Sequence, residues 1–67
     1  MKRREWLMQF RKEKGLSIKA IAKLSGVTQQ CWSNYEIGKR TPRPNKAQKI
    51  AKLLGFKWTK FYEDEKE

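Results

Sequence analysis

Residues 18–37 read IKAIAKLSGVTQQCWSNYEI, and they give the strongest indication of how the chain folds. Apolar side chains recur at helical spacing on both sides of Gly26, whose position predicts a tight turn with a positive φ angle. Thr28 is suited to cap the helix after the turn, and Gly38 follows the last apolar residue of that helix. The stretch therefore predicts two short helices joined as a helix-turn-helix unit, in which the first helix braces the second.

The rest of the chain predicts three more helices and no strands. One helix is expected over residues 3–14, another from its N-cap Asn45 to Gly55, and a short last one after Thr59. Ser17 is expected to cap the first helix of the helix-turn-helix unit. The residues expected to face the core are Trp6, Leu7, Phe10, Ile21, Ala22, Val27, Trp32, Tyr35, Ala47, Ile50, Ala51, Leu53 and Leu54.

The length of the chain limits it to one domain. A chain of 67 residues buries only a single small core. We therefore expect an all-α domain over residues 1–62, a compact five-helix bundle, followed by a disordered acidic tail at residues 63–67. Trp58, Phe61 and Tyr62 near the end of the domain either seal the core or form a contact between the two chains of a dimer.

Positive charge dominates the chain and is unevenly distributed. The formal net charge is +10, from 17 lysines and arginines against 7 acids. Four of the acids lie in the last five residues, EDEKE, so the rest of the chain is more basic still. A basic body is typical of nucleic-acid binders, although a soluble surface or an anionic membrane would also suit it. Because no apolar run reaches the length of a signal or membrane segment, we expect a cytoplasmic protein associated with the nucleoid of a bacterial cell.

The residue types needed for catalysis and metal binding are scarce. The chain has no histidine, few carboxylates, and Cys31 as its only cysteine. A nucleophile paired with a base, or a cluster of metal ligands, is therefore not evident. We expect no enzymatic activity, no cofactor, no metal and no small-molecule ligand, and we interpret Cys31 as a small helix residue rather than a redox switch.

Several short elements occur in an order that resembles the helix-turn-helix proteins of the Cro and phage-repressor type, also called the xenobiotic-response-element family. They are Lys14-Gly15-Leu16-Ser17, Ala22, Gly26-Val27-Thr28, Tyr35-Glu36, Gly38-Lys39-Arg40, Pro44, Ile50-Ala51 and Leu54-Gly55. The resemblance spans residues 5 to about 62. It implies a five-helix, lambda-repressor-like fold that binds double-stranded operator DNA, usually as a homodimer on a roughly palindromic site. The chain departs from the family at Ile18, often glutamine, at Trp32, commonly isoleucine or valine, and at Cys31, often threonine.

The resemblance also implies roles for individual residues. The second helix of the unit would enter the major groove, where glutamine and asparagine amides pair with adenine. The expected base-reading residues are Gln29, Gln30, Ser33 and Asn34. The expected contacts to the DNA backbone are Ser17, Lys19, Thr28, Lys39, Arg40, Thr41, Arg43 and Lys46. Arg11 and Glu36 resemble the internal salt bridge of the family, while Lys2, Arg3 and Arg4 form either a DNA-grasping arm or a solvated chain end.

These observations favour a sequence-specific transcriptional regulator, and most of all a Cro-like phage or prophage repressor. The alternative is an antitoxin or another interaction module that uses the same fold to bind a protein as well as DNA. A third reading is an architectural DNA-binding protein of the excisionase kind.

Overall fold

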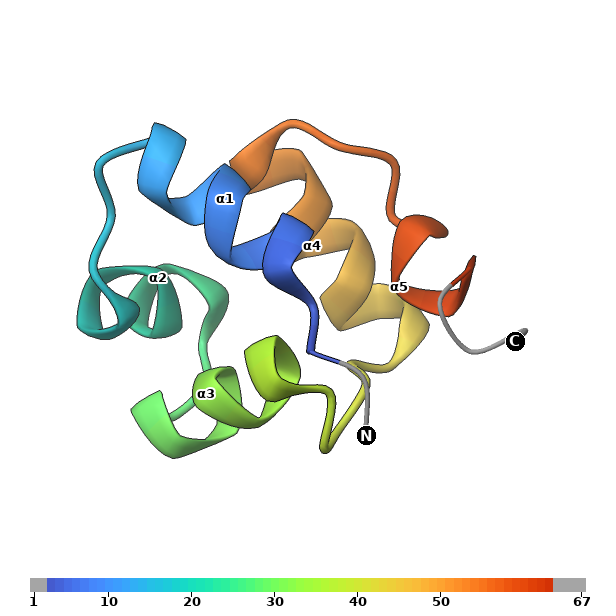
Figure 1. The fold of residues 1–67 in the computed structure, drawn as a ribbon, viewed down its shortest axis with the longest axis horizontal. Helices are drawn as coiled ribbons and strands as arrows, with labels where there is room; N and C mark the ends of the chain where they lie inside the picture. Colours follow the sequence, from blue (N-terminus) through green and yellow to red (C-terminus); the bar gives the residue numbers. More distant parts are fainter. Residues whose placement is uncertain (1–2, 64–67) are drawn as a thin grey trace.

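The computed structural model describes residues 3–63, which form five α-helices and no strand (Figure 1). The helices are α1 (Glu5–Glu13), α2 (Ile18–Ser25), α3 (Gln29–Ile37), α4 (Pro44–Leu54) and α5 (Lys60–Glu63). The prediction of an all-α, five-helix bundle is confirmed. Residues 64–67 of the expected tail and Lys2 of the expected arm lie outside the described residues.

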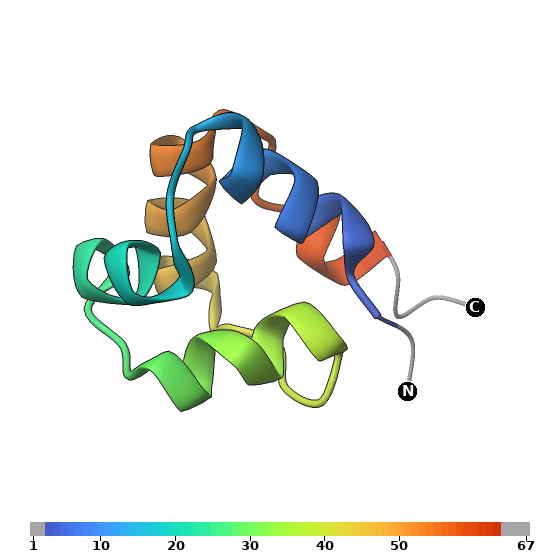
Figure 2. The same ribbon diagram turned by 60° about the vertical axis from the view of Figure 1, so that its left-hand side comes forward.

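The five helices leave one side of α3 uncovered. α2 packs mainly against α3, and α1 and α4 complete the bundle by packing on α3 and α2 respectively. Figures 1 and 2 both place α3 at the lower edge of the molecule, and no other described helix covers its outer side. Each described helix is too short or too polar to cross a lipid bilayer. The fold therefore fixes α3 against its neighbouring helices and leaves one face of it uncovered.

The core is built around large side chains from every helix. Trp32 and Phe61 are its largest wholly buried members. Beside it, the ring of Trp6 meets the rings of Phe56 and Phe61 edge-on, with centroid distances of 5.1 and 5.4 Å. The other buried apolar residues are Leu7, Ile21, Ala22, Tyr35, Ala47, Ile50, Ala51 and Leu54. Trp6, Phe10, Val27 and Leu53, which were expected inside the core, are instead partly buried and pack against it.

Local side-chain chemistry sets the ends of α2 and α3 as predicted. The hydroxyl of Ser17 accepts a hydrogen bond from the amide of Ala20 at 3.1 Å, and that of Thr28 accepts from Cys31 at 3.0 Å. These two caps satisfy amides that a helix start leaves without partners. Gly26 ends α2 with a φ of 76°, in the left-handed region that glycine adopts without strain.

Two predicted helix starts are wrong. α4 begins at Pro44 with Arg43 as its N-cap, two residues before the start predicted from Asn45. Proline has its φ fixed near the helical value and suits the first helical position. Asn45 instead accepts a hydrogen bond from the amide of Lys46 at 2.9 Å. α1 begins at Glu5 rather than residue 3, because Arg4 donates its amide to the Glu36 carbonyl at 2.7 Å.

Candidate nucleic-acid interface

The free face of α3 carries the amide side chains that the sequence predicted to read bases. Gln29 and Gln30 in its first turn are exposed, and Ser33 and Asn34 are half-buried. Gln30 Nε2 donates to Asn34 Oδ1 at 3.3 Å, so two of these amides lie together one turn apart. All four side chains are uncharged, and the face can therefore approach a polyanion or a base edge without burying a charge.

The opposite face of α3 is tied to α1 by a buried polar cluster. Arg11 Nε donates to Glu36 Oε2 at 2.6 Å, and Trp32 Nε1 donates to the same oxygen at 2.7 Å. Arg11 also donates from Nη1 to the Leu16 carbonyl at 2.9 Å, at the entry to α2. The salt bridge implied by the family resemblance is thus formed. It joins α1 to α3, and the bond from Arg11 to Leu16 adds the connection between α1 and α2.

Residues 38–43, here called the basic loop, follow α3 and bear positively charged side chains at the surface. The carbonyl of Asn34 accepts from the amides of Lys39 and Arg40 at 2.9 and 3.1 Å. Gly38 makes this turn with a φ of 84°. The side chains of Lys39, Arg40 and Arg43 are exposed. The loop therefore places basic groups next to the C-terminal end of α3.

Two residues that the sequence did not single out for this purpose hold the basic loop. Arg4 donates from Nη1 to the Arg40 carbonyl at 2.9 Å and from Nη2 to Thr41 Oγ1 at 2.5 Å. Tyr62 donates its hydroxyl to the Pro42 carbonyl at 2.7 Å. Arg4 is only 3% exposed, so the suggestion that it belongs to a DNA-grasping arm or a solvated end is wrong. Its neighbour Arg3 is exposed.

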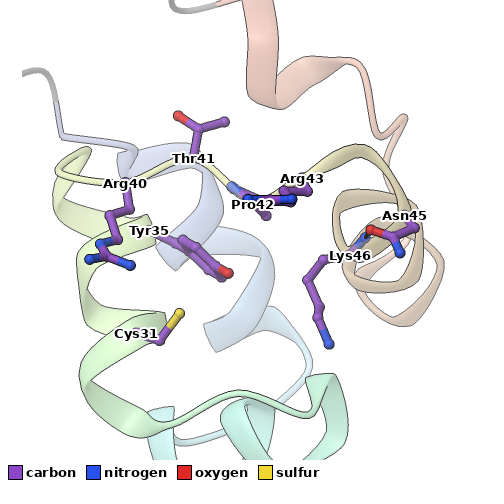
Figure 3. A pocket seen from close by; sticks show the side chains of 8 residues that line it. All are labelled: Cys31, Tyr35, Arg40, Thr41, Pro42, Arg43, Asn45 and Lys46. Atoms are coloured by element: carbon purple, nitrogen blue, oxygen red, sulfur yellow. Dashed lines mark hydrogen bonds between the residues drawn. The ribbon is translucent and has the colours of Figure 1, made fainter.

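A cavity of about 340 Å³ opens between α3, the basic loop and the start of α4 (Figure 3). The thiol of Cys31 and the ring of Tyr35 point into it from α3 (Figure 3). Its lining is completed by Arg40, Thr41, Pro42, Arg43, Asn45 and Lys46. Burial raises the pKa of Tyr35 from 10.0 to about 12, and Cys31 acts in the same direction while the charge of Arg40 opposes it.

Comparison with known proteins identifies the scaffold that carries these features. The helix-turn-helix family model matches residues 7–61, which is most of the chain. The chain belongs to the Cro/repressor-type helix-turn-helix family. It is 38% identical over 61 residues to the uncharacterized HTH-type transcriptional regulator YqaF of Bacillus subtilis (strain 168), and the match covers 91% of this chain and 80% of that protein. Membership makes the chain a DNA-binding transcription regulator of this type.

The helix-turn-helix scaffold uses several of the predicted backbone-contact residues for its own structure. Ser17 and Thr28 are exposed at helix starts, where their hydroxyls accept capping hydrogen bonds. Thr41 accepts a hydrogen bond from Arg4. Lys46 is half-buried, and its ammonium donates to the Ser25 carbonyl at 2.8 Å, which joins α4 to the end of α2. Lys19, in contrast, is exposed on the first turn of α2.

The aromatic residues near the C-terminal end of the helix-turn-helix domain divide into two groups. Phe61 is 0% exposed, so it is part of the core and offers no surface to a second chain. The expectation that Phe61 contributes to a dimer contact is therefore wrong. Trp58 and Tyr62 are half-buried and pack edge-on with their centroids 5.8 Å apart. They are the members of the predicted set that retain exposed area.

Proposed function

We propose that the protein is a sequence-specific repressor of the Cro type, of phage or prophage origin, that acts by occupying operator DNA in the bacterial cytoplasm. The observation that carries this proposal is the face of α3. It combines exposed, uncharged amide side chains with a basic loop directly after the helix. We infer that regulation comes from binding alone, without catalysis, a cofactor or a small-molecule ligand.

In this proposal α3 enters the major groove through its N-terminal turn. Gln29 and Gln30 pair with base edges, and Asn34 and Ser33 extend the contact by one turn. A good bidentate amide–adenine pair contributes about 1–3 kcal/mol of discrimination against the wrong base. The hydrogen bond of 3.3 Å between Gln30 and Asn34 supports this assignment, because it orients two of the amides before DNA arrives.

The phosphate contacts come from the edges of the same surface. Lys39, Arg40 and Arg43 of the basic loop are exposed beside α3, as is Lys19 on α2. The amides at the start of α2, next to Ser17, and of α4 add neutral donors to the phosphate oxygens. Thr28, Thr41 and Lys46 contribute through groups that already stabilise the scaffold.

We further propose that the repressor binds a pseudo-palindromic site as a homodimer. Trp58 and Tyr62 are the candidate contact between the two chains, since both are large, half-buried aromatics outside the α3 face. A two-fold dimer on one side of B-DNA reads half-sites about 34 Å apart. Half-sites separated by one helical turn in a selected operator are therefore the expected result.

Selection from random duplexes tests the proposal directly. The wild-type protein is expected to enrich a motif with two related half-sites. Gln29→Ala and Gln30→Ala should each relax the preference at one position of the half-site, whereas Lys39→Gln should weaken binding to all sequences equally. Absence of any enriched motif would contradict sequence specificity. Equal loss of affinity for every sequence in all three variants would contradict the base-reading assignment.

A second candidate function is an antitoxin, which binds a protein partner as well as DNA. Leu24 on α2 is the residue to test for it, because among residues 3–63 it is the large apolar side chain left exposed, at 49%. The measurement is complex formation with the product of a neighbouring gene, compared between the wild type and Leu24→Lys. A complex that Leu24→Lys disrupts, without loss of DNA binding, would favour the antitoxin.

A further inference from the structure

Side chains from opposite ends of the chain hold the same three consecutive residues of the basic loop. Arg4 lies before α1 and donates to the Arg40 carbonyl and the Thr41 hydroxyl. Tyr62 lies in α5 and donates to the Pro42 carbonyl. The loop is thus bonded from both sides at the residues that directly follow Lys39.

The surroundings of the Arg4 guanidinium hold it in place beside the basic loop. Its Nη1 also donates to the Tyr35 carbonyl at 2.7 Å, in the last turn of α3. A cation at this end of a helix complements the negative pole of the helix dipole. The guanidinium carbon lies 5.7 Å from the centre of the wholly buried Phe61 ring. Since Arg4 is 3% exposed, its charge is not available to touch a phosphate directly.

The three groups that accept hydrogen bonds from Arg4 need a side chain with two separate donor nitrogens rather than one. Nη1 serves two carbonyls and Nη2 serves a hydroxyl, so the three bonds leave from two separate nitrogens. Guanidinium supplies this rigid planar arrangement, whereas a lysine ammonium is one point on a flexible stem. Lysine at this position would keep the positive charge but could not reproduce the three bonds together.

Fixing the loop matters because its basic side chains are flexible and exposed. Ordering a residue on binding opposes association, because backbone entropy is lost. A loop that is already held in one conformation loses less entropy when it meets a phosphate. The anchored carbonyls of Arg40 and Pro42 set the direction of the main chain from which Lys39 and Arg40 project.

We propose that Arg4 and Tyr62 are positioning residues for the DNA backbone: neither contacts DNA, and together they preorganise the basic loop so that Lys39 and Arg40 reach phosphates. This inference rests on the proposed backbone role of the loop. It is independent of which bases α3 reads and of repression.

The test compares Arg4→Lys with the charge-preserving control Lys52→Arg at an exposed position of α4. Tyr62→Phe, which removes only the bonding hydroxyl, is compared with Thr59→Val, which removes a hydroxyl that makes no hydrogen bond to the loop in residues 3–63. Affinity for a random-sequence duplex is measured by fluorescence anisotropy at several salt concentrations. The folded fraction of each variant is measured at the same temperature by circular dichroism.

Arg4→Lys and Tyr62→Phe are expected to bind about three- to tenfold more weakly than the wild type while fully folded. Loss of one phosphate contact should also reduce the slope of log affinity against log salt by about 0.9. Lys39→Gln should weaken binding less in the Arg4→Lys background than in the wild type, because the two changes act on one contact. The amides of Lys39 and Arg40 should exchange hydrogen faster in Arg4→Lys. Both controls should match the wild type in every measurement.

A merely structural role would lower the melting temperature and leave the affinity and salt slope of the folded protein unchanged, and that result would overturn the inference. If Arg4→Lys does not fold, Tyr62→Phe decides the question, since it removes one oxygen; because Tyr62 is also a candidate dimer contact, its dimerisation is compared with that of the wild type by analytical ultracentrifugation. A wild type that binds no duplex would contradict the proposed function itself. A wild type that binds DNA without enriching a motif would contradict sequence specificity and leave the positioning inference to be judged by the variants.

Discussion

Trp32 and Glu36 form a hydrogen bond of 2.7 Å between the indole nitrogen and a carboxylate oxygen one turn further along α3. The same oxygen accepts from Arg11 of α1 at 2.6 Å. The indole therefore fills the core and also supplies a second donor to a buried carboxylate. This explains how tryptophan fits at a position where the family commonly has isoleucine or valine. It also makes α3 dependent on a charged cluster on the side opposite its exposed glutamines.

Removing the carboxylate charge should destabilise the fold strongly. In Glu36→Gln the guanidinium of Arg11 stays buried without its counter-charge, and breaking such a pair lowers the free energy of unfolding by about 3–5 kcal/mol. Glu13→Gln, an exposed change on α1, should stay within about 0.5 kcal/mol of the wild type. Urea denaturation followed by circular dichroism measures both. Equal stability of the two variants would show that the pair is not energetically coupled to folding.

Replacing the indole tests the other donor of the cluster. Trp32→Phe loses the hydrogen bond to Glu36 and leaves space in a core where the side chain is wholly buried. We expect a loss of about 2–4 kcal/mol in the free energy of unfolding. The half-buried Trp58→Phe serves as control, with an expected loss near 1 kcal/mol. A smaller effect at Trp32 than at Trp58 would contradict the role assigned to the buried indole.

The N-cap of α3 should affect the turn that carries the predicted base-reading glutamines. Thr28→Ala leaves the amide of Cys31 without its 3.0 Å acceptor and should lower stability by about 1 kcal/mol. Thr28→Ser keeps the hydroxyl and should be close to the wild type. Hydrogen exchange of the Cys31 amide reports the same change locally. Equal exchange rates in the two variants would mean that the cap does not protect this turn.

Stability at alkaline pH should depend on Tyr35. Burial raises the pKa of Tyr35 from 10.0 to about 12, so the unfolded chain loses the phenolic proton before the folded chain does. The contribution of the neutral Tyr35 phenol to the free energy of unfolding is therefore complete below pH 10. It is lost as the pH rises from 10 toward 12. The difference in unfolding free energy between wild type and Tyr35→Phe should shrink by about 1–2 kcal/mol across this range. A constant difference would contradict the raised pKa.

Two glycines with similar φ angles should respond differently to alanine. Gly26 and Gly55 have φ angles of +76° and +86°, where a Cβ is strained by about 1–2 kcal/mol. At Gly55 the added carbon meets open space, whereas at Gly26 it lies 3.4 Å from the ammonium of Lys46. A carbon at this distance crowds the ammonium, which donates a hydrogen bond to the Ser25 carbonyl. Gly26→Ala should therefore be the more destabilising change in urea denaturation, and the reverse order would refute this account.

Local features of the sequence were sufficient to predict the helix-turn-helix unit. Ser17, Gly26 and Thr28 act on neighbours within four residues along the chain, and such short-range chemistry is visible in the sequence. The start of α4 was misplaced because two cap signals compete there, and Pro44 at the first helical position prevailed over Asn45.

Long-range partners could not be predicted in the same way. Arg4 bonds to groups 31 to 37 residues away, and in a chain with 17 basic residues no pattern distinguishes this arginine from its neighbours. The spacing of Trp32 and Glu36 by one helical turn was a usable signal for their hydrogen bond. Whether Phe61 or Tyr62 faces the core depends on where a four-residue helix settles, which only the packed structure determines.

The anchoring of the basic loop by Tyr62 has a consequence for protein synthesis. Residues 18–37 leave the ribosome before Tyr62 does, so a nascent chain can pair α2 with α3 while the Pro42 carbonyl still lacks its phenolic donor. Contacts of high sequence separation form late in folding for the same entropic reason. The basic loop therefore reaches its anchored conformation only after Tyr62 has been synthesised and has left the ribosome.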